Sequence, residues 1–257
     1  MKPFFLIAGP CAVESEDTCL EIAASVHRIC RDLSIPYYFK ASYKKANRTR
    51  LDSFTSIGFE PALEILAKVK ETEGIPVLTD VHESHECETV AQYVDVLQIP
   101  AFLCRQTDLL LAAGNTGKII NIKKGQFLSP EAMRFAKQKV ESTGNQQVWL
   151  TERGTTFGYT DLVVDITSIP RMQAFGGQVV MDCTHSVQKP NQTEGITGGD
   201  AQMIETMAKA AVAVGVDGLF IETHPDPASA SSDAQSMLPL ERLRPILERC
   251  MAIRERI

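Results

Sequence analysis

The sequence predicts a single-domain α/β protein, a (β/α)8 TIM barrel that spans residues 1–257. Short β-prone runs alternate with helical patterns along the whole chain, which indicates parallel strands joined by right-handed crossovers. The chain contains eight such units, and a barrel of eight units takes about 250 residues. No linker or low-complexity segment divides the pattern. An open doubly wound sheet is the alternative. Such a sheet does not require eight evenly spaced units, and the G-x-G-x-x-G typical of it does not follow the first run.

The expected elements follow one another in a regular order. The strands are FFLIAG (4–9), YYFKAS (37–42), VLTDV (77–81), VLQIPA (96–101), IINIKK (119–124), VWLTERG (148–154), QVVMDCTH (178–185) and GLFIETH (218–224). The helices are residues 16–33, 61–71, 83–93, 107–114, 129–142, 168–176, 201–215 and 238–256. In the first helix, Leu20, Ala23, Ala24 and His27 recur at helical spacing, which is the periodicity of an amphipathic helix.

Composition excludes several classes of function. The chain is 44% apolar and 23% charged, which is typical of a globular protein with a full core. Its net charge of −6, without a basic tail, argues against nucleic acid or acidic lipid as a partner. No apolar run approaches the ~20 residues that cross a membrane, and the N-terminal run is too short for a signal peptide. The seven cysteines form no C-x-x-C pair, so we expect reduced thiols in a cytoplasmic protein.

The active site of such a barrel lies at the C-terminal ends of its strands. Cationic residues gather at these ends, and they are Lys40, Lys45, Arg48, Arg105, Lys123 and Arg153. Along residues 119–124, Asn121 and Lys123 share one face while Ile120 and Ile122 share the other, so the lysine is expected to point into the barrel. One such cation alone is usually a solvated rim residue. Six on one rim of an acidic protein favour a site for more than one phosphate or carboxylate group.

A second cluster combines a thiol, an imidazole and carboxylates. Cys11, His185, Glu222 and Asp233 follow the first, seventh and eighth expected strands, which are neighbours in a closed barrel. Such a mixed set suits a divalent transition metal better than Mg²⁺ or Ca²⁺, which prefer oxygen ligands. No local motif such as H-E-x-x-H is present. From the residues alone, a packed cysteine beside a structural histidine therefore stays open as the alternative.

Long motifs in the chain resemble those of the 3-deoxy-D-manno-octulosonate 8-phosphate synthases. They are IAGPCAVES, FKASYKKANR, LTDVHE, LQIPAFLCRQTDLL, NIKKGQF, LTERGTTFGY, DCTHSVQ and ETHPDP…SDAQSMLP, in this order and over nearly the whole chain. The resemblance implies a (β/α)8 barrel that is usually a homotetramer. It also implies condensation of phosphoenolpyruvate with D-arabinose 5-phosphate, which gives 3-deoxy-D-manno-octulosonate 8-phosphate and phosphate for the lipopolysaccharide inner core.

The resemblance also implies roles for individual residues. The family has a metal-dependent branch with cysteine after Gly-Pro and a metal-independent branch with asparagine, and this chain has Cys11. The implied ligands of one divalent metal (Fe²⁺, Zn²⁺, Mn²⁺ or Co²⁺) are Cys11, His185, Glu222 and Asp233. The implied phosphoenolpyruvate site consists of Lys40, Ser42, Lys45, Gln98, the backbone at Ala101, Lys123 and Arg153. The implied sugar phosphate site consists of Asn47, Arg48, Thr49 and Arg105, the last acting in a neighbouring subunit. The expected catalytic residues are Lys45 together with His185 and Asp233, which combine ligation with proton handling.

The chain departs from the family at two places. It has KKANRTR where D-K-A-N-R-S-S is common, so Thr49 keeps the hydroxyl while Lys44 and Arg50 add charge. Residues 188–199 differ from the usual glycine-rich loop, although their glycine and polar content suits a mobile lid.

Three other functions are alternatives to this one. The sister enzyme, 3-deoxy-D-arabino-heptulosonate 7-phosphate synthase, uses erythrose 4-phosphate but typically has a K-P-R-T-S-like segment in place of KANRT. A metal-dependent hydrolase of phosphorylated sugars fits the metal and the cations equally well. A non-catalytic scaffold has no need for polar residues at all eight strand ends.

Overall fold

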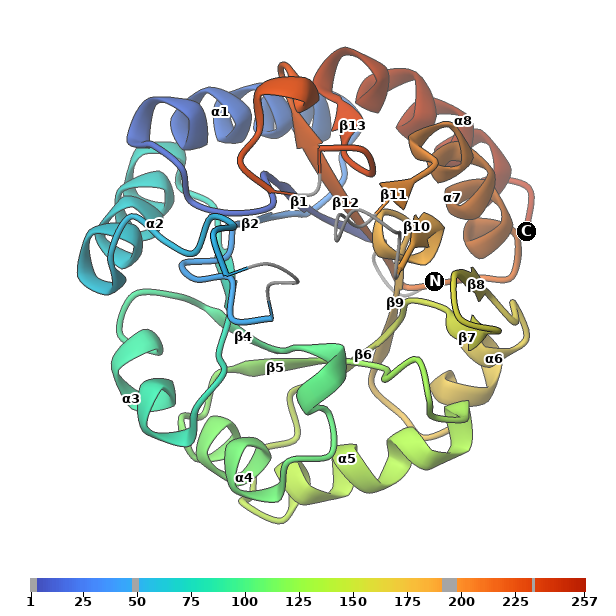
Figure 1. The fold of residues 1–257 in the computed structure, drawn as a ribbon. Helices are drawn as coiled ribbons and strands as arrows, with labels where there is room; N and C mark the ends of the chain where they lie inside the picture. Colours follow the sequence, from blue (N-terminus) through green and yellow to red (C-terminus); the bar gives the residue numbers. More distant parts are fainter. Residues whose placement is uncertain (1–3, 48–50, 191–197, 233) are drawn as a thin grey trace.

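The computed structural model describes residues 4–47, 51–190, 198–232 and 234–257. Within them, eight parallel strands close into a barrel and eight helices surround it (Figure 1), which confirms the predicted fold. The barrel closes because β1 pairs with β2 on one side and with β12 on the other. Its strands are β1 (Phe5–Gly9), β2 (Tyr37–Lys40), β3 (Val77–Asp80), β4 (Val96–Ile99), β5 (Ile119–Lys123), β6 (Val148–Glu152), β9 (Gln178–Asp182) and β12 (Gly218–His224).

The helices lie between the barrel strands and after the last one. They are α1 (Glu16–Asp32), α2 (Phe59–Glu73), α3 (Cys87–Val90), α4 (Thr107–Asn115), α5 (Met133–Glu141), α6 (Ser168–Gln173), α7 (Ile204–Ala213) and α8 (Leu243–Arg254). The Ser15 side chain caps the first of them by accepting a hydrogen bond from the backbone of Thr18. Helix α3 is shorter than the sequence predicts. A turn of 3₁₀-helix at Ser84–Glu86 precedes it, because the Glu86 side chain folds back onto the backbone of His82 and Glu83.

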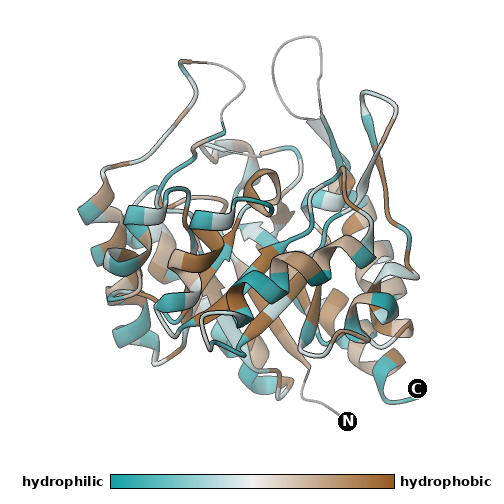
Figure 2. Cartoon of the chain, turned by 90° about the horizontal axis from the view of Figure 1, so that it is seen from below, coloured by the Kyte–Doolittle hydropathy of each residue, from teal (hydrophilic) through white to brown (hydrophobic). Residues whose placement is uncertain are grey.

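Short strands and 3₁₀-helices lie in the loops at the C-terminal end of the barrel. The strands are the hairpin of β7 (Thr155–Phe157) with β8 (Asp161–Val163), the pair β10 (Gln188–Lys189) with β11 (Gly198–Gly199), and β13 (Leu238–Pro239) beside β12. Further 3₁₀-helices are Ala101–Leu103, Pro130–Ala132, His185–Val187, Ala201–Met203, Pro227–Ser229 and Leu240–Arg242. In the side view, these loops project at the end of the barrel opposite to both termini (Figure 2).

Alternation along the strands separates two cores. Outward side chains, such as Ile120 and Ile122 of β5, are buried in the large core between strands and helices, as predicted. Inward side chains near the N-terminal ends form a smaller apolar core that includes Phe5 and Trp149. At the other end, the inward positions are polar. The barrel interior therefore changes from apolar to charged along its axis, and the charged end is where the loops project.

Gly9 allows a close approach of two strands at that end. A Cβ atom at Gly9 would lie 2.1 Å from the backbone oxygen of Lys40. Any larger residue would push β1 away from β2. The pairing of the two segments continues beyond the strand ends through a bridge between Ala12 and Ser42. The glycine thus brings Cys11 and Lys40 together.

Within the described ranges, no helix combines the length and the apolar composition needed to cross a membrane.

Candidate active site

A cavity of about 630 Å³ opens at the C-terminal ends of the strands. Its lining includes side chains from β2, β3, β4 and β5 and from the loops that follow β6, β9 and β12. The residues of the sequence prediction that line it are Lys40, Ser42, Lys45, Asn47, Gln98, Ala101, Lys123, Arg153 and His185. The structure therefore brings most of the expected substrate-binding residues together in one cavity.

The other predicted residues lie elsewhere. Cys11 and Glu222 are fully buried and adjoin the cavity residues Ser232 and Lys40. Arg105 is exposed and precedes α4, and its side chain does not line the cavity of its own chain. Arg48, Thr49 and Asp233 lie outside the described residues, as does most of the expected lid at 188–199.

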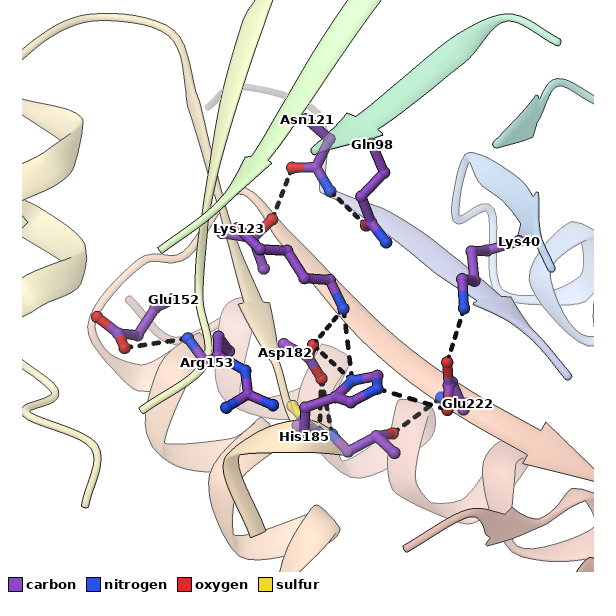
Figure 3. Close-up of polar contacts among 12 residues, drawn as sticks. Lys40, Gln98, Asn121, Lys123, Glu152, Arg153, Asp182, His185 and Glu222 are labelled. Carbon is purple, nitrogen blue, oxygen red and sulfur yellow. Dashed lines mark hydrogen bonds and ion pairs between the residues drawn. The ribbon is translucent and has the colours of Figure 1, made fainter. Parts of the chain in front are cut away.

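A chain of hydrogen bonds runs around the barrel through four neighbouring strands. The Thr151 hydroxyl donates to Asn121 Oδ1 at 2.6 Å, and Asn121 Nδ2 donates to Gln98 Oε1 at 2.9 Å. Gln98 Nε2 then donates to Asp80 Oδ1 at 2.5 Å (Figure 3 shows Asn121 and Gln98). The register of the strands places Asp80, Gln98 and Asn121 side by side. The oxygen of the Gln98 amide accepts from Asn121 and its nitrogen donates to Asp80, so the orientation of this amide is fixed.

Asp80 is the acceptor at the end of this chain. Its other oxygen accepts the hydroxyl hydrogen of Ser42, and Lys40 Nζ lies 3.9 Å from it. Burial raises the pKa of Asp80, but Lys40 and Lys45 outweigh that effect and hold it well below its usual range. Asp80 is therefore a permanent negative charge that orients Ser42, Gln98 and Lys40 at the cavity wall.

A second group of charges surrounds Lys123. Its Nζ donates to Asp182 Oδ2 at 2.6 Å and lies 3.8 Å above the centroid of the Phe220 ring. Burial lowers the pKa of Lys123, and Asp182 opposes this shift. Burial raises the pKa of Asp182, but His185 and Lys123 outweigh it and hold the pKa well below the usual range. The lysine is thus held at a defined point of the cavity by a carboxylate and an aromatic face.

Asp182 also fixes the orientation of His185. Asp182 Oδ1 accepts the backbone N–H groups of Thr184 and His185, at 3.1 and 2.8 Å. His185 Nδ1 lies 2.7 Å from Asp182 Oδ2, so this nitrogen carries the proton that a carboxylate requires from its partner. Nε2, the other ring nitrogen, points toward Glu222 (Figure 3).

Glu222 links the charges around Asp80 and Lys40 to the charges around Lys123 and His185. Its Oε1 accepts a hydrogen bond from Lys40 Nζ at 2.8 Å, and the same ammonium donates to the backbone oxygen of Cys11 at 3.0 Å. Burial raises the pKa of Glu222, but Lys40 and then His185 outweigh it and lower the pKa to about 2. Lys40 thereby connects the segment that contains Cys11 to the carboxylate of β12.

The donor set at this point is compatible with a metal ion but does not form a closed site. Glu222 Oε2 is buried and has no hydrogen-bond partner among the described residues, and it lies 3.7 Å from His185 Nε2. A buried carboxylate oxygen that faces an imidazole nitrogen in this way suits a cation between them. Over the described ranges, however, no three His, Cys, Asp or Glu side chains form a group able to hold a metal ion. Asp233, the fourth expected ligand, lies outside the described residues.

The sequence indicates the cations of the cavity, and Glu222 as a candidate metal ligand, but not which carboxylates pair with the cations. Lys123 pairs with Asp182, and Lys40 pairs with Glu222 and lies near Asp80. The signal was present in the sequence, because Asp80 and Asp182 each end a strand two residues after an inward-facing apolar residue, Leu78 and Val180 respectively. What the sequence lacks is the partner, since these pairs join residues 40 to 182 positions apart along the chain.

The fold and the site define this protein as a (β/α)8-barrel enzyme whose active-site cavity is lined by buried cations. Residues 2–256 match the model of the DAHP synthetase I family, and the chain belongs to that family. It is 53% identical over 253 residues to the 2-dehydro-3-deoxyphosphooctonate aldolase of Cyanothece sp., which covers 98% of this chain and 93% of the relative. Proteins of the same name from Koribacter versatilis (50% identical, 98% of this chain and 92% of the relative) and Granulibacter bethesdensis (53%, 96% and 88%) are similarly close.

Proposed function

We propose that the chain is a 2-dehydro-3-deoxyphosphooctonate aldolase working in the synthetic direction. It condenses phosphoenolpyruvate with D-arabinose 5-phosphate and water to give 3-deoxy-D-manno-octulosonate 8-phosphate and phosphate, for the lipopolysaccharide inner core. The relatives of that name support this proposal. The structural observation that carries it is the convergence of Lys40, Lys45, Lys123 and Arg153 on one cavity.

The cations have a plain role in this reaction. Two anionic substrates repel each other, and holding them in contact requires positive charge that is already in position. We assign phosphoenolpyruvate to Lys40, Ser42, Lys45, Gln98, the backbone at Ala101, Lys123 and Arg153. We assign the sugar phosphate to Asn47, Arg48, Thr49 and Arg105. Asn47 lines the same cavity, so the two assigned sites adjoin each other.

The chemistry forms one carbon–carbon bond and one carbon–oxygen bond, the latter from water, and breaks the carbon–oxygen bond to phosphate. Carbon 3 of phosphoenolpyruvate attacks the sugar aldehyde, water adds at carbon 2, and the resulting intermediate loses phosphate. Charge develops on the aldehyde oxygen and on the departing phosphate, where the ammonium groups of Lys40, Lys45 and Lys123 stabilise it. Lys45, His185 and Asp233 are the residues that we assign to catalysis, and Asp182 holds His185 by Nδ1 so that Nε2 faces Glu222.

A divalent transition metal is part of the proposal. Cys11, His185, Glu222 and Asp233 would hold Fe²⁺, Zn²⁺, Mn²⁺ or Co²⁺, and the buried unpaired Oε2 of Glu222 supports this assignment. When bound, the metal supplies Lewis acidity that polarises the aldehyde or orients the water.

Assembly and location are also proposed. An exposed Arg105 outside the cavity of its own chain agrees with a homotetramer in which Arg105 serves the neighbouring site. All seven cysteines lie among the described residues and none of them forms a disulfide bond, which agrees with a cytoplasmic enzyme.

The direct test measures phosphate release with each substrate alone and with both together. A synthase releases phosphate only when phosphoenolpyruvate and arabinose 5-phosphate are both present, and it forms the eight-carbon product in equal amount. Release from one substrate alone at the full rate would instead identify a hydrolase.

A further inference from the structure

A second buried lysine follows the cavity lysine directly. Lys124 is 1% exposed, and alternation along the strand turns its side chain away from the cavity that Lys123 lines. Lys124 Nζ lies 3.1 Å from both Gly154 O and Thr155 Oγ1, and 3.3 Å from the carboxylate oxygen Oε1 of Glu152. It is therefore held against the loop that follows β6 and not against the substrate cavity.

Glu152 holds the same loop from its other side. Its Oε1 accepts the backbone N–H of Arg153 at 3.0 Å and that of Gly154 at 2.7 Å (Figure 3). Gly154 has a φ of +92°, in the left-handed region, so the chain turns sharply here. One carboxylate oxygen thus receives an ammonium and two peptide groups, and all three contacts adjoin Arg153.

Arg153 points the other way, into the cavity. It is 6% exposed, lines the cavity, and donates from Nη2 to Gln188 Oε1 at 3.1 Å. Lys123 and Arg153 therefore face the substrate, while Lys124 and Glu152, their neighbours along the chain, form an ion pair behind them. A buried ion pair is weak as a source of stability, since both charges lose their hydration. What such a pair does supply is a fixed position for its two side chains and for the backbone groups that they contact.

We propose that the Lys124–Glu152 pair positions Arg153 for phosphoenolpyruvate, and that Lys124 is a positioning residue of the reaction. This inference rests on the function proposed above. Without Lys124, the carboxylate of Glu152 loses its countercharge and Gly154 loses a hydrogen bond to its carbonyl oxygen. The peptide groups on both sides of Arg153 are then less restrained, and its guanidinium no longer meets the anion at bidentate distance.

The first test compares Lys124→Met with Lys137→Met. Lys137 is the matched control, because it is also a buried lysine paired with a glutamate, Glu141, but lies on α5 and does not line the cavity. We expect Lys124→Met to raise the KM for phosphoenolpyruvate about tenfold and to change the KM for arabinose 5-phosphate by less than about twofold. Lys137→Met is expected to change neither. Equal increases in both KM values for Lys124→Met would overturn the proposal.

The second test asks whether Lys124 acts through Arg153. In an Arg153→Met background, Lys124→Met should change the KM for phosphoenolpyruvate by less than about twofold, because the residue it positions is gone. Effects that multiply would contradict the inference. If Lys124→Met does not fold, Lys124→Met/Glu152→Gln leaves no unpaired buried charge and takes its place with the same expectations.

Calorimetric titration with phosphoenolpyruvate separates this inference from the proposed function. It measures the affinity without turnover, so a wild-type protein that binds phosphoenolpyruvate but condenses nothing refutes the proposed function alone. Unchanged affinity in Lys124→Met refutes the positioning role alone. A wild-type protein that does not bind phosphoenolpyruvate refutes both.

Discussion

The two ends of the barrel interior are built from the same strands and have opposite character. Near the N-terminal ends, the ring centroids of Phe5 and Trp149 lie 4.7 Å apart, and those of Tyr38 and Trp149 lie 5.0 Å apart. Near the C-terminal ends, Lys123 and Asp182 form a buried ion pair in place of such a ring cluster. The aromatic end stabilises the fold through buried apolar area. The charged end contains paired ions that are costly to bury, and such perturbed ionisable groups cluster at functional sites.

Removal of the metal is expected to have the largest effect on the charged end. If Cys11 is a ligand, chelator abolishes turnover and Mn²⁺, Co²⁺ or Fe²⁺ restores it. Cys11→Ser should retain less metal, measured by elemental analysis, while the barrel stays folded. Cys11→Asn should keep some activity that chelator does not remove, because asparagine occupies this place in the metal-independent branch. Full wild-type activity at zero metal content would show that Cys11 is only a packed thiol.

Lys123→Met should have the next largest effect. It removes an ammonium from the cavity but leaves Asp182 with the backbone N–H groups of Thr184 and His185 and with His185 Nδ1. We expect kcat/KM to fall by about two to three orders of magnitude, as when a preorganised electrostatic donor is lost. Steady-state assays with both substrates measure this. A fall of less than about tenfold would place Lys123 outside the reaction.

Trp149→Phe tests the other end of the barrel. It keeps a ring between Phe5 and Tyr38 but leaves part of the space unfilled. We expect the free energy of unfolding to fall by about 1–3 kcal/mol, measured by urea denaturation. Both KM values should stay unchanged, and a selective change in either one would show that the two ends of the barrel are coupled.

Asn47→Ala is expected to have the smallest effect. Asn47 lines the cavity at its rim, in the segment assigned to the sugar phosphate. Loss of one hydrogen bond should raise the KM for arabinose 5-phosphate about tenfold. The KM for phosphoenolpyruvate serves as the internal control, and a larger rise in that value would reverse the assignment of the two sites.

The barrel strands were predictable because each consists of a short apolar run that ends in polar residues. All eight expected strands begin within one residue of the observed ones, for example 119–124 for Ile119–Lys123. The β7–β8 hairpin was not foreseen. It lies in the largely exposed segment TTFGYTDLV (155–163), and its turn includes Gly158, whose φ is +66°. Local sequence gives little indication of such a turn when no apolar alternation surrounds it.

The candidate site was predictable as a set of residues but not as a network. Strand alternation placed Lys123 inside the barrel, as observed. The pairs Lys40–Glu222 and Lys123–Asp182 depend on barrel closure and on side-chain length, which no local pattern contains. Arg105 precedes α4 and lies outside the cavity of its own chain, and its role in the site of a neighbouring subunit stays a prediction.

The most direct test of the proposed function is the choice of aldose. The kcat/KM for condensation with phosphoenolpyruvate is measured for arabinose 5-phosphate and for erythrose 4-phosphate, with the products identified by mass. The proposed function predicts that arabinose 5-phosphate is preferred by at least about a hundredfold. Equal or faster condensation of erythrose 4-phosphate would contradict it and identify the sister enzyme instead.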